Sequence, residues 1–139
     1  ALDQCRLKPE YEKLLTVPGI GKVLCLTIML ETGDIRRFAQ VGNYTSYCRC
    51  VKAKRTSNRK EKGENNSKNG NKYLAWAYVE AANFMIRHCL EAQKWYQRKL
   101  ARSGGKRVLA IKALASKISK ACYFIMRDQV PFDQRRIFG

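Results

Sequence analysis

The chain has 139 residues, of which 45% are hydrophobic, so it is long enough for a folded domain and too apolar to be disordered by composition. It carries 28 lysine and arginine residues against 11 acidic residues, a formal net charge of +17, which is typical of a protein that binds nucleic acid. No apolar run reaches the roughly 20 residues of a membrane span, and residues 1–10 lack the apolar core of a signal peptide. We therefore expect a single cytoplasmic domain over residues 1–139, without a membrane partner.

Apolar residues at helical spacing predict five helices, over residues 9–16, 22–32, 41–48, 73–92 and 108–127. A further segment, 94–102, continues or bends from the fourth helix. Gly33 stands at a C-cap position, Asp34 can cap a short turn, and Pro131 ends the last helix. No stretch shows strand alternation, an internal repeat or a coiled-coil heptad. The sequence therefore predicts an all-α fold, a small helical bundle.

The same spacing indicates which side chains face the core. In the helix over 73–92 they include Phe84, and Trp76 widens the apolar face. In the last helix they include Leu109. The helix over 22–32 is apolar nearly all round, which is typical of a buried helix.

Six cysteines occur in the chain, and nothing suggests secretion, which disfavours disulfides. Cys25 and Cys122 fall in apolar helical stretches, where free thiols behave as small hydrophobes. The pairs Cys48–Cys50 and His88–Cys89 could in principle bind zinc, but their spacing is not that of a zinc finger. We expect buried thiols and no metal ligands.

The positive charge is concentrated in two segments. Residues 49–72 hold nine basic and two acidic residues, and residues 94–120 hold nine basic residues and no acidic one. The first segment has almost no large apolar side chain, which predicts a long basic loop, mobile in the free protein. The second contains Trp95 and Tyr96, which either stack on bases or simply belong to the core.

The basic loop over 49–72 suits contact with a nucleic-acid backbone, and the alternative is a solvated charged loop. It contains two serines, Ser57 and Ser67. A serine among cations can be a nucleophile whose developing negative charge the cations stabilise. It can equally be a loop residue without a chemical role. The basic side chains of the loop are Lys52, Lys54, Arg55, Arg59, Lys60, Lys62, Lys68 and Lys72.

The stretch from Leu14 to Lys22 resembles a helix-hairpin-helix element, in which two helices flank a Gly-hydrophobe-Gly turn. Gly19 and Gly21 let the backbone turn and approach a phosphate closely. The N–H groups that open the next helix bind anions, and Lys22 adds a charge. Ile20 holds the hairpin to the core. Such contacts position DNA without reading its sequence, and the alternative is an ordinary turn between two packed helices.

Several motifs in order resemble the C-terminal domain of transposases of the insertion sequence 110/116/902 family, which are bacterial RuvC-like recombinases. The resemblance covers about residues 12–132. It rests on TVPGIG (16–21), ETGDIRRF (31–38), Thr56-Ser57-Asn58 with Lys62-Gly63, SKNGNKYL (67–74) and the helices that follow.

The resemblance implies that a serine of this domain attacks DNA and forms a covalent linkage during strand exchange. It does so in a composite site with an N-terminal RuvC-like nuclease domain, whose four acidic residues hold magnesium. By position the nucleophile is Ser57, with Ser67 as runner-up, and Lys68, Asn71 and Lys72 are nucleic-acid contacts. The implied partners are DNA, a structured guide RNA, the nuclease domain and other transposase subunits, and the implied location is the bacterial nucleoid.

The chain leaves no room for that nuclease domain. We therefore expect a fragment that binds DNA, holds no cofactor of its own and is inactive alone. Two other hypotheses stay open: a helix-hairpin-helix DNA-binding module without chemistry, and a basic RNA-binding protein.

Overall fold

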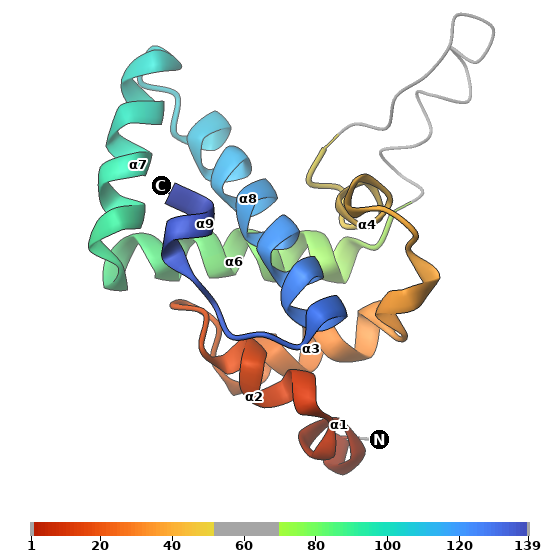
Figure 1. Cartoon of the computed structure of the whole chain (residues 1–139). Coiled ribbons are helices and arrows are strands. Elements are labelled where there is room, and N and C mark those ends of the chain that lie inside the picture. The colour runs from red at the N-terminus through yellow and green to blue at the C-terminus, as the bar shows by residue number, and fades with distance from the viewer. Residues whose placement is uncertain (1, 52–69, 139) are drawn as a thin grey trace, which may run out of the picture.

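The computed structural model describes residues 2–51 and 70–138 and shows a bundle of helices (Figure 1). Neither range contains a strand, so the predicted all-α fold is confirmed. Within these ranges no helix is both long enough and apolar enough to cross a membrane. The elements are α1 Leu2–Leu7, α2 Pro9–Leu15, α3 Lys22–Thr32, the 3-10 turn η1 Ile35–Arg37, α4 Val41–Tyr47, α6 Lys72–His88, α7 Leu90–Arg102, α8 Arg107–Asp128 and α9 Gln134–Phe138.

Local sequence signals account for several helix boundaries. Helix α3 ends at Gly33, whose φ of 67° is the left-handed conformation that favours glycine after a helix. Asp34 accepts a hydrogen bond from the Arg36 N–H at 2.9 Å and so caps η1, as predicted. Helix α8 ends at Asp128, before Pro131 as predicted, and its C-cap Gln129 is left-handed with a φ of 54°. The helix ends predicted from the sequence are therefore largely correct.

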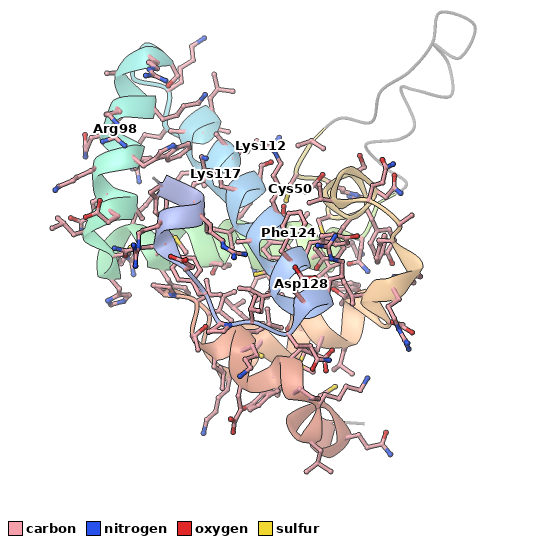
Figure 2. All side chains as sticks on the ribbon, viewed as in Figure 1. Cys50, Arg98, Lys112, Lys117, Phe124 and Asp128 are labelled. Carbon is pink, nitrogen blue, oxygen red and sulfur yellow. The ribbon has the colours of Figure 1, made fainter. Side chains whose placement is uncertain are left out.

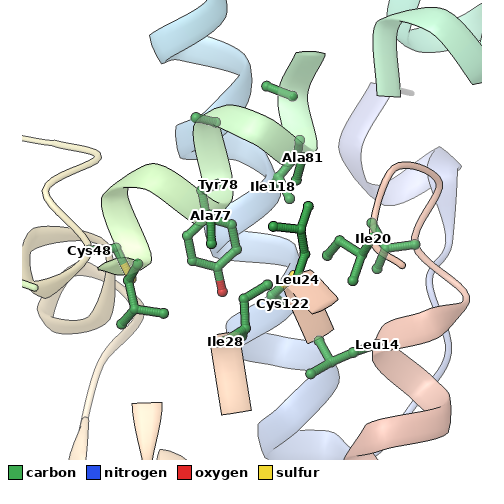
Figure 3. Close-up of a cluster of buried hydrophobic side chains, with 14 of the residues drawn as sticks. Leu14, Ile20, Leu24, Ile28, Cys48, Ala77, Tyr78, Ala81, Ile118 and Cys122 are labelled. Atoms are coloured by element: carbon green, nitrogen blue, oxygen red, sulfur yellow. The ribbon is translucent and has the colours of Figure 1, made fainter. Parts of the chain in front are cut away.

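Helix α8 lies at the centre of the fold, because it packs against α2, α4, α6, α7, α9 and η1 (Figure 1). Its main contact is with α6, where the small side chains of Ala77 and Ala81 let the two backbones approach each other. Figure 3 shows these alanines in one cluster with Ile118 and Cys122 of α8 and Leu14 of α2. All five side chains are fully buried. Burying a large apolar side chain stabilises the fold by about 1.5–3 kcal/mol.

A chain of buried hydroxyl groups joins α3, α4 and α6. The Tyr44 hydroxyl lies 2.8 Å from Thr32 Oγ1 and 2.6 Å from the Tyr78 hydroxyl, and all three side chains are fully buried. The Tyr123 hydroxyl of α8 donates to the Phe38 carbonyl at 2.8 Å. These hydrogen bonds satisfy polar groups that would otherwise destabilise the core, and they hold α4 against the bundle.

The helix boundaries differ from the prediction at the junction of α6 and α7. Helix α6 ends at His88 and α7 begins at Leu90, because Cys89 between them has an extended backbone with φ −127° and ψ 113°. We expected one helix to about residue 92, and no glycine or proline marks the break. The short end helices α1 and α9 are also absent from the prediction, since a helix of five or six residues carries little periodicity.

The buried face of α6 is the one that the spacing predicts, except at two large side chains. Trp76 is 49% exposed and Phe84 is 38% exposed, whereas Ala77, Ala81 and Met85 are fully buried, as their spacing predicts. Leu109 near the start of α8 is 51% exposed as well. The prediction placed these three large side chains inside, and it is wrong for them because helical spacing sets each of them beside the stripe of buried positions of its helix.

Candidate nucleic-acid interface

The turn between α2 and α3 folds back onto α6. Val17 and Ile20 are buried, so Ile20 holds the turn to the core as predicted. Gly19 has a φ of 96°, and a Cβ there would lie 2.6 Å from the Ala81 carbonyl oxygen and 2.8 Å from Met85 N. Only glycine fits this contact. The close approach expected toward a phosphate is thus made to α6, and a DNA contact at Gly19 stays a prediction.

Gly21 and Lys22 lie on the open side of the same turn. Gly21 is the N-cap of α3, and nothing lies within 4 Å of the position that its Cβ would take. The Cys25 N–H is bonded to the Gly21 carbonyl at 2.9 Å, so the N–H groups before it have no acceptor within the helix. Lys22 is exposed beside them. This end of α3 therefore combines outward N–H groups with a cation, an arrangement that favours an anion such as phosphate.

An open groove lies beside this end of α3. It is lined by residues 19–24 together with Phe84 and His88 of α6. Val23 on its wall is 71% exposed, although its apolar surroundings in the sequence predict burial. The groove thus places apolar side chains and Lys22 next to the N–H groups of the turn.

The two described ends of the basic segment meet at the end of α4. The Asn71 N–H donates to the Tyr47 carbonyl at 2.6 Å. Gly70 packs so closely that a Cβ there would lie 2.6 Å from the same oxygen. On the other side, the Cys50 N–H donates to the Thr45 carbonyl at 2.9 Å. The residues that precede and follow 52–69 are therefore held at one place, between α4 and α6.

Asn71 is the N-cap of α6 and the centre of a polar cluster. Its Oδ1 accepts from the N–H groups of Tyr73 and Leu74, both at 2.9 Å. Its Nδ2 donates to Glu31 Oε1 at 2.8 Å and to the Tyr47 hydroxyl at 3.3 Å. The side-chain amide is thus engaged within the protein, and a nucleic-acid contact at Asn71 stays a prediction.

Three members of this cluster, Glu31, Arg37 and Tyr47, are not among the predicted site residues. Arg37 Nε donates to a carbonyl at the end of α3 at 2.9 Å, and its guanidinium lies 4.4 Å from the Phe38 ring centroid and 4.8 Å from that of Tyr47. The hydrogen bond from Asn71, and next that from Arg37, lower the pKa of Tyr47 below its ordinary value. Glu31 and Arg37 belong to the ETGDIRRF stretch, which was a signal for them, whereas nothing in the sequence marks Tyr47.

The second basic segment forms the outer sides of α7 and α8 (Figure 2). Tyr96 is buried and so belongs to the core, with its hydroxyl accepting from Arg107 Nε at 3.3 Å. Trp95 is half-buried, and Lys117 Nζ lies 5.5 Å from its ring centroid. The exposed cations of this surface are Lys94, Arg98, Arg102, Lys106, Arg107, Lys112 and Lys120.

The proposed nucleophile and most of the predicted loop contacts lie outside the described residues. They are Ser57, Ser67, Lys54, Arg55, Arg59, Lys60, Lys62 and Lys68. Of the loop contacts, Lys72 is described: it is exposed, and its Nζ lies 5.3 Å from the Tyr73 ring centroid.

Four thiols of the described residues are protonated at neutral pH. Burial raises the pKa of Cys25 to about 12 and that of Cys50 to about 11, and it also raises the pKa of Cys48 and Cys122. Within residues 2–51 and 70–138 no group of three His, Cys, Asp or Glu is placed to hold a metal ion.

Comparison with known proteins identifies the family. Residues 11–97 match the model of the transposase IS116/IS110/IS902 family. A probable family 20 transposase of Pseudomonas aeruginosa is 25% identical over 121 residues, which cover 84% of this chain and 35% of that relative. The chain thus spans about a third of the length of the curated relative it matches. The chain belongs to the IS116/IS110/IS902 family of transposases.

Proposed function

We propose that this chain is the DNA-binding C-terminal part of a transposase and that it supplies a serine nucleophile for DNA strand exchange. Family membership supports the transposase role. The net charge of +17 supports a nucleic-acid ligand. The active site is composite in this proposal, since a RuvC-like nuclease domain contributes the acidic residues and the magnesium that they hold.

The observation that carries the proposal is the meeting of two family stretches at one point of the bundle. Glu31 and Arg37 come from the stretch 31–38, and Asn71 comes from the stretch 67–74. They meet at Tyr47, where the segment that bears Ser57 leaves the bundle and returns to it. A cluster that fixes both ends of a segment limits where its residues can reach, which suits a segment that must present a nucleophile to a separate domain.

The proposed chemistry is a transesterification. Ser57 Oγ attacks the phosphorus of one phosphodiester and loses its proton, so that a serine–phosphate ester forms. The bond from phosphorus to one deoxyribose oxygen breaks, and that oxygen takes up a proton. Attack by a hydroxyl of another strand reverses these events and joins the new ends. Lys60 and Lys62 would stabilise the negative charge that develops on the phosphate.

The hairpin turn would hold the duplex at the opposite end of α3 and α6 from this cluster. The first N–H groups of α3 and the Lys22 ammonium would bind a backbone phosphate at the end of the helix. Such a contact positions DNA but does not read its sequence. Target choice would therefore come from another partner, which in this proposal is a structured guide RNA.

The decisive test is Ser57→Ala in an enzyme reconstituted with its RuvC-like domain. The variant should lose the covalent protein–DNA adduct, detected by denaturing electrophoresis of labelled DNA, and should keep its affinity for DNA. Ser67→Ala is the matched control and should keep the adduct. Loss of the adduct in Ser67→Ala alone would transfer the role to Ser67. An adduct that survives both changes would contradict the proposed chemistry.

A helix-hairpin-helix module without chemistry is the second candidate. The open side of the turn favours it, since the N-cap Gly21 has nothing within 4 Å of its Cβ position and Lys22 is exposed, so that a phosphate can be bound without any catalytic serine. This candidate predicts salt-sensitive DNA binding and no effect of Ser57→Ala on any activity. A basic RNA-binding protein, the third hypothesis, would prefer structured RNA over duplex DNA in direct competition.

A further inference from the structure

The C-terminal half of α8 and the segment 130–137 enclose a cavity of about 260 Å³. Figure 2 labels two of its lining residues, Lys117 and Phe124, on α8. The cavity has apolar walls and a rim of cations. Its principal lining residues are Phe124, Ile125, Phe132, Lys117, Lys120 and Arg136.

The walls of this cavity are held in place from both ends of the segment. The Phe132 N–H donates to Thr16 Oγ1 at 2.8 Å, which ties the segment to the turn after α2. Lys117 Nζ donates to the Ile137 carbonyl at 3.1 Å, which ties α9 to α8. The cavity is therefore a formed part of the fold, and it is connected to the hairpin turn by a hydrogen bond.

The rim of the cavity has an excess of positive charge. Arg136 lies 4.0 Å from Asp133, but no ion pair in the described part of the chain includes Lys117 or Lys120. Burial lowers the pKa of Lys117, and repulsion from Lys120 and Lys99 lowers it further. An anion at the rim would relieve this repulsion.

The ligand that fits has a flat apolar part and an adjacent anionic group. The cavity is smaller than the roughly 300–1,000 Å³ of a pocket for a drug-sized ligand. The aromatic rings of Phe124 and Phe132 offer surfaces on which a base can stack. A base enters such a cavity only when it is unpaired, because a duplex keeps its bases stacked.

We propose that this cavity receives one unpaired base of a nucleic-acid strand while Lys117, Lys120 and Arg136 hold the neighbouring phosphates. This inference rests on the proposed function, since it takes nucleic acid as the ligand of the chain. It adds a subsite for single-stranded nucleic acid, distinct from the duplex contact at the hairpin. The strand is DNA or RNA, and both offer the same base and phosphate chemistry.

The test fills the cavity without changing the charge. Ala121→Leu adds a larger apolar side chain to the cavity wall, and Ala101→Leu on the exposed side of α7 is the matched control. The whole chain is titrated against labelled oligo(dT), oligo(rU) and duplex DNA of about 12 nucleotides, with fluorescence anisotropy as the readout. Ala121→Leu should weaken single-strand binding by about fivefold or more, with duplex binding unchanged. Whichever of oligo(dT) and oligo(rU) binds with the higher affinity shows whether the cavity takes a DNA or an RNA strand.

A second measurement does not depend on the folding of Ala121→Leu. The chain has two tryptophans, so Trp76→Phe leaves Trp95, which lies beneath Lys117, as the fluorescent reporter. A single strand should change its emission with the same affinity as in the anisotropy titration, and duplex DNA should not.

Three outcomes overturn the inference. They are an unaltered single-strand affinity in Ala121→Leu, an equal loss of that affinity in Ala101→Leu, or a Trp95 emission that does not change when a single strand is added. In each of them, salt-dependent duplex binding would leave the proposed function intact. Failure of every nucleic acid to bind the parent chain would instead overturn the proposed function itself.

Discussion

Glu31 in the last turn of α3 accepts a hydrogen bond from Asn71, the N-cap of α6, with 2.8 Å between Oε1 and Nδ2. The two residues lie 40 positions apart in the sequence. The Oδ1 atom of the same side-chain amide caps α6. One side chain therefore both starts this helix and ties it to α3. The polar cluster at the base of the basic segment therefore depends on Asn71.

Asn71→Ala should lower the free energy of unfolding by about 2 kcal/mol, because loss of an N-cap and of a hydrogen bond to a carboxylate each costs about 1 kcal/mol. Asn71→Asp sets a second carboxylate against Glu31 but keeps the N-cap. Because the cap is kept, its loss of unfolding free energy should be smaller than that of Asn71→Ala. Asn43→Ala on the exposed side of α4 is the control. Urea denaturation at neutral pH measures all three, and a loss for Asn71→Ala as small as that of the control would contradict the proposed coupling.

Gly19→Ala should destabilise the fold by at least about 2 kcal/mol, because an alanine there is strained by its positive φ and meets the backbone of α6. Gly21→Ala in the same turn should cost less than about 1 kcal/mol, since its Cβ would meet open space. Thermal or chemical unfolding compares the two. Similar costs for both would mean that the turn does not press against α6 in solution.

The fold should lose stability in alkaline solution through its buried thiols. Cys25 is fully buried, and burial raises the pKa of its thiol from 9.0 to about 12. The unfolded chain thus ionises this thiol near pH 9, and the folded chain ionises it only near pH 12. The contribution of the Cys25 thiol to the free energy of unfolding is therefore complete below pH 9. It is lost between pH 9 and 12, at about 1.4 kcal/mol for each pH unit.

Cys25→Ala should therefore show a flatter loss of stability above pH 9 than the parent chain. The free energy of unfolding is measured by urea titration at several pH values between 9 and 11, with a reductant present. Parallel curves for the two proteins would show that the Cys25 thiol ionises equally easily in the folded and unfolded states.

Neutralising Lys60 and Lys62 to glutamine should reduce the salt dependence of DNA binding. Removing one cation that binds a phosphate lowers the slope of log K against log salt by about one. Lys8→Gln, an exposed lysine at the junction of α1 and α2, is the control. Anisotropy titrations with duplex DNA from about 50 to about 200 mM salt give the slope. An unchanged slope in the double variant would exclude the basic segment as a backbone contact.

Capping residues and the helical spacing of apolar residues predicted most of the helices and their ends. Gly33 and Asp34 end and begin elements where the sequence predicts, and α8 ends at Asp128, before Pro131. The errors come from tertiary packing: Cys89 breaks a helix that its own sequence would continue, and Phe84 is 38% exposed because the stripe of α6 that packing buries ends beside it. Neither effect has a local signal.

The candidate site was predictable only in part. The glycine turn and the lysine-rich segment carry their own chemistry, and both were evident in the sequence. The cluster of Glu31, Tyr47 and Asn71 was not, because its members join only after α3, α4 and α6 pack together. Hydrogen bonds between residues far apart in the chain leave no periodic pattern.

The bond from the Asn71 N–H to the Tyr47 carbonyl also bears on how this domain can evolve. Since the chain leaves and rejoins the bundle at one point, the packing of α4 on α8 and of α6 on α8 makes no demand on how many residues lie between. Doubling the length of a flexible connection costs only about 0.6 kcal/mol in closure entropy. A change in the number of residues between Val51 and Gly70 should therefore leave the bundle intact, so that the reach of this segment toward DNA is set separately from the fold.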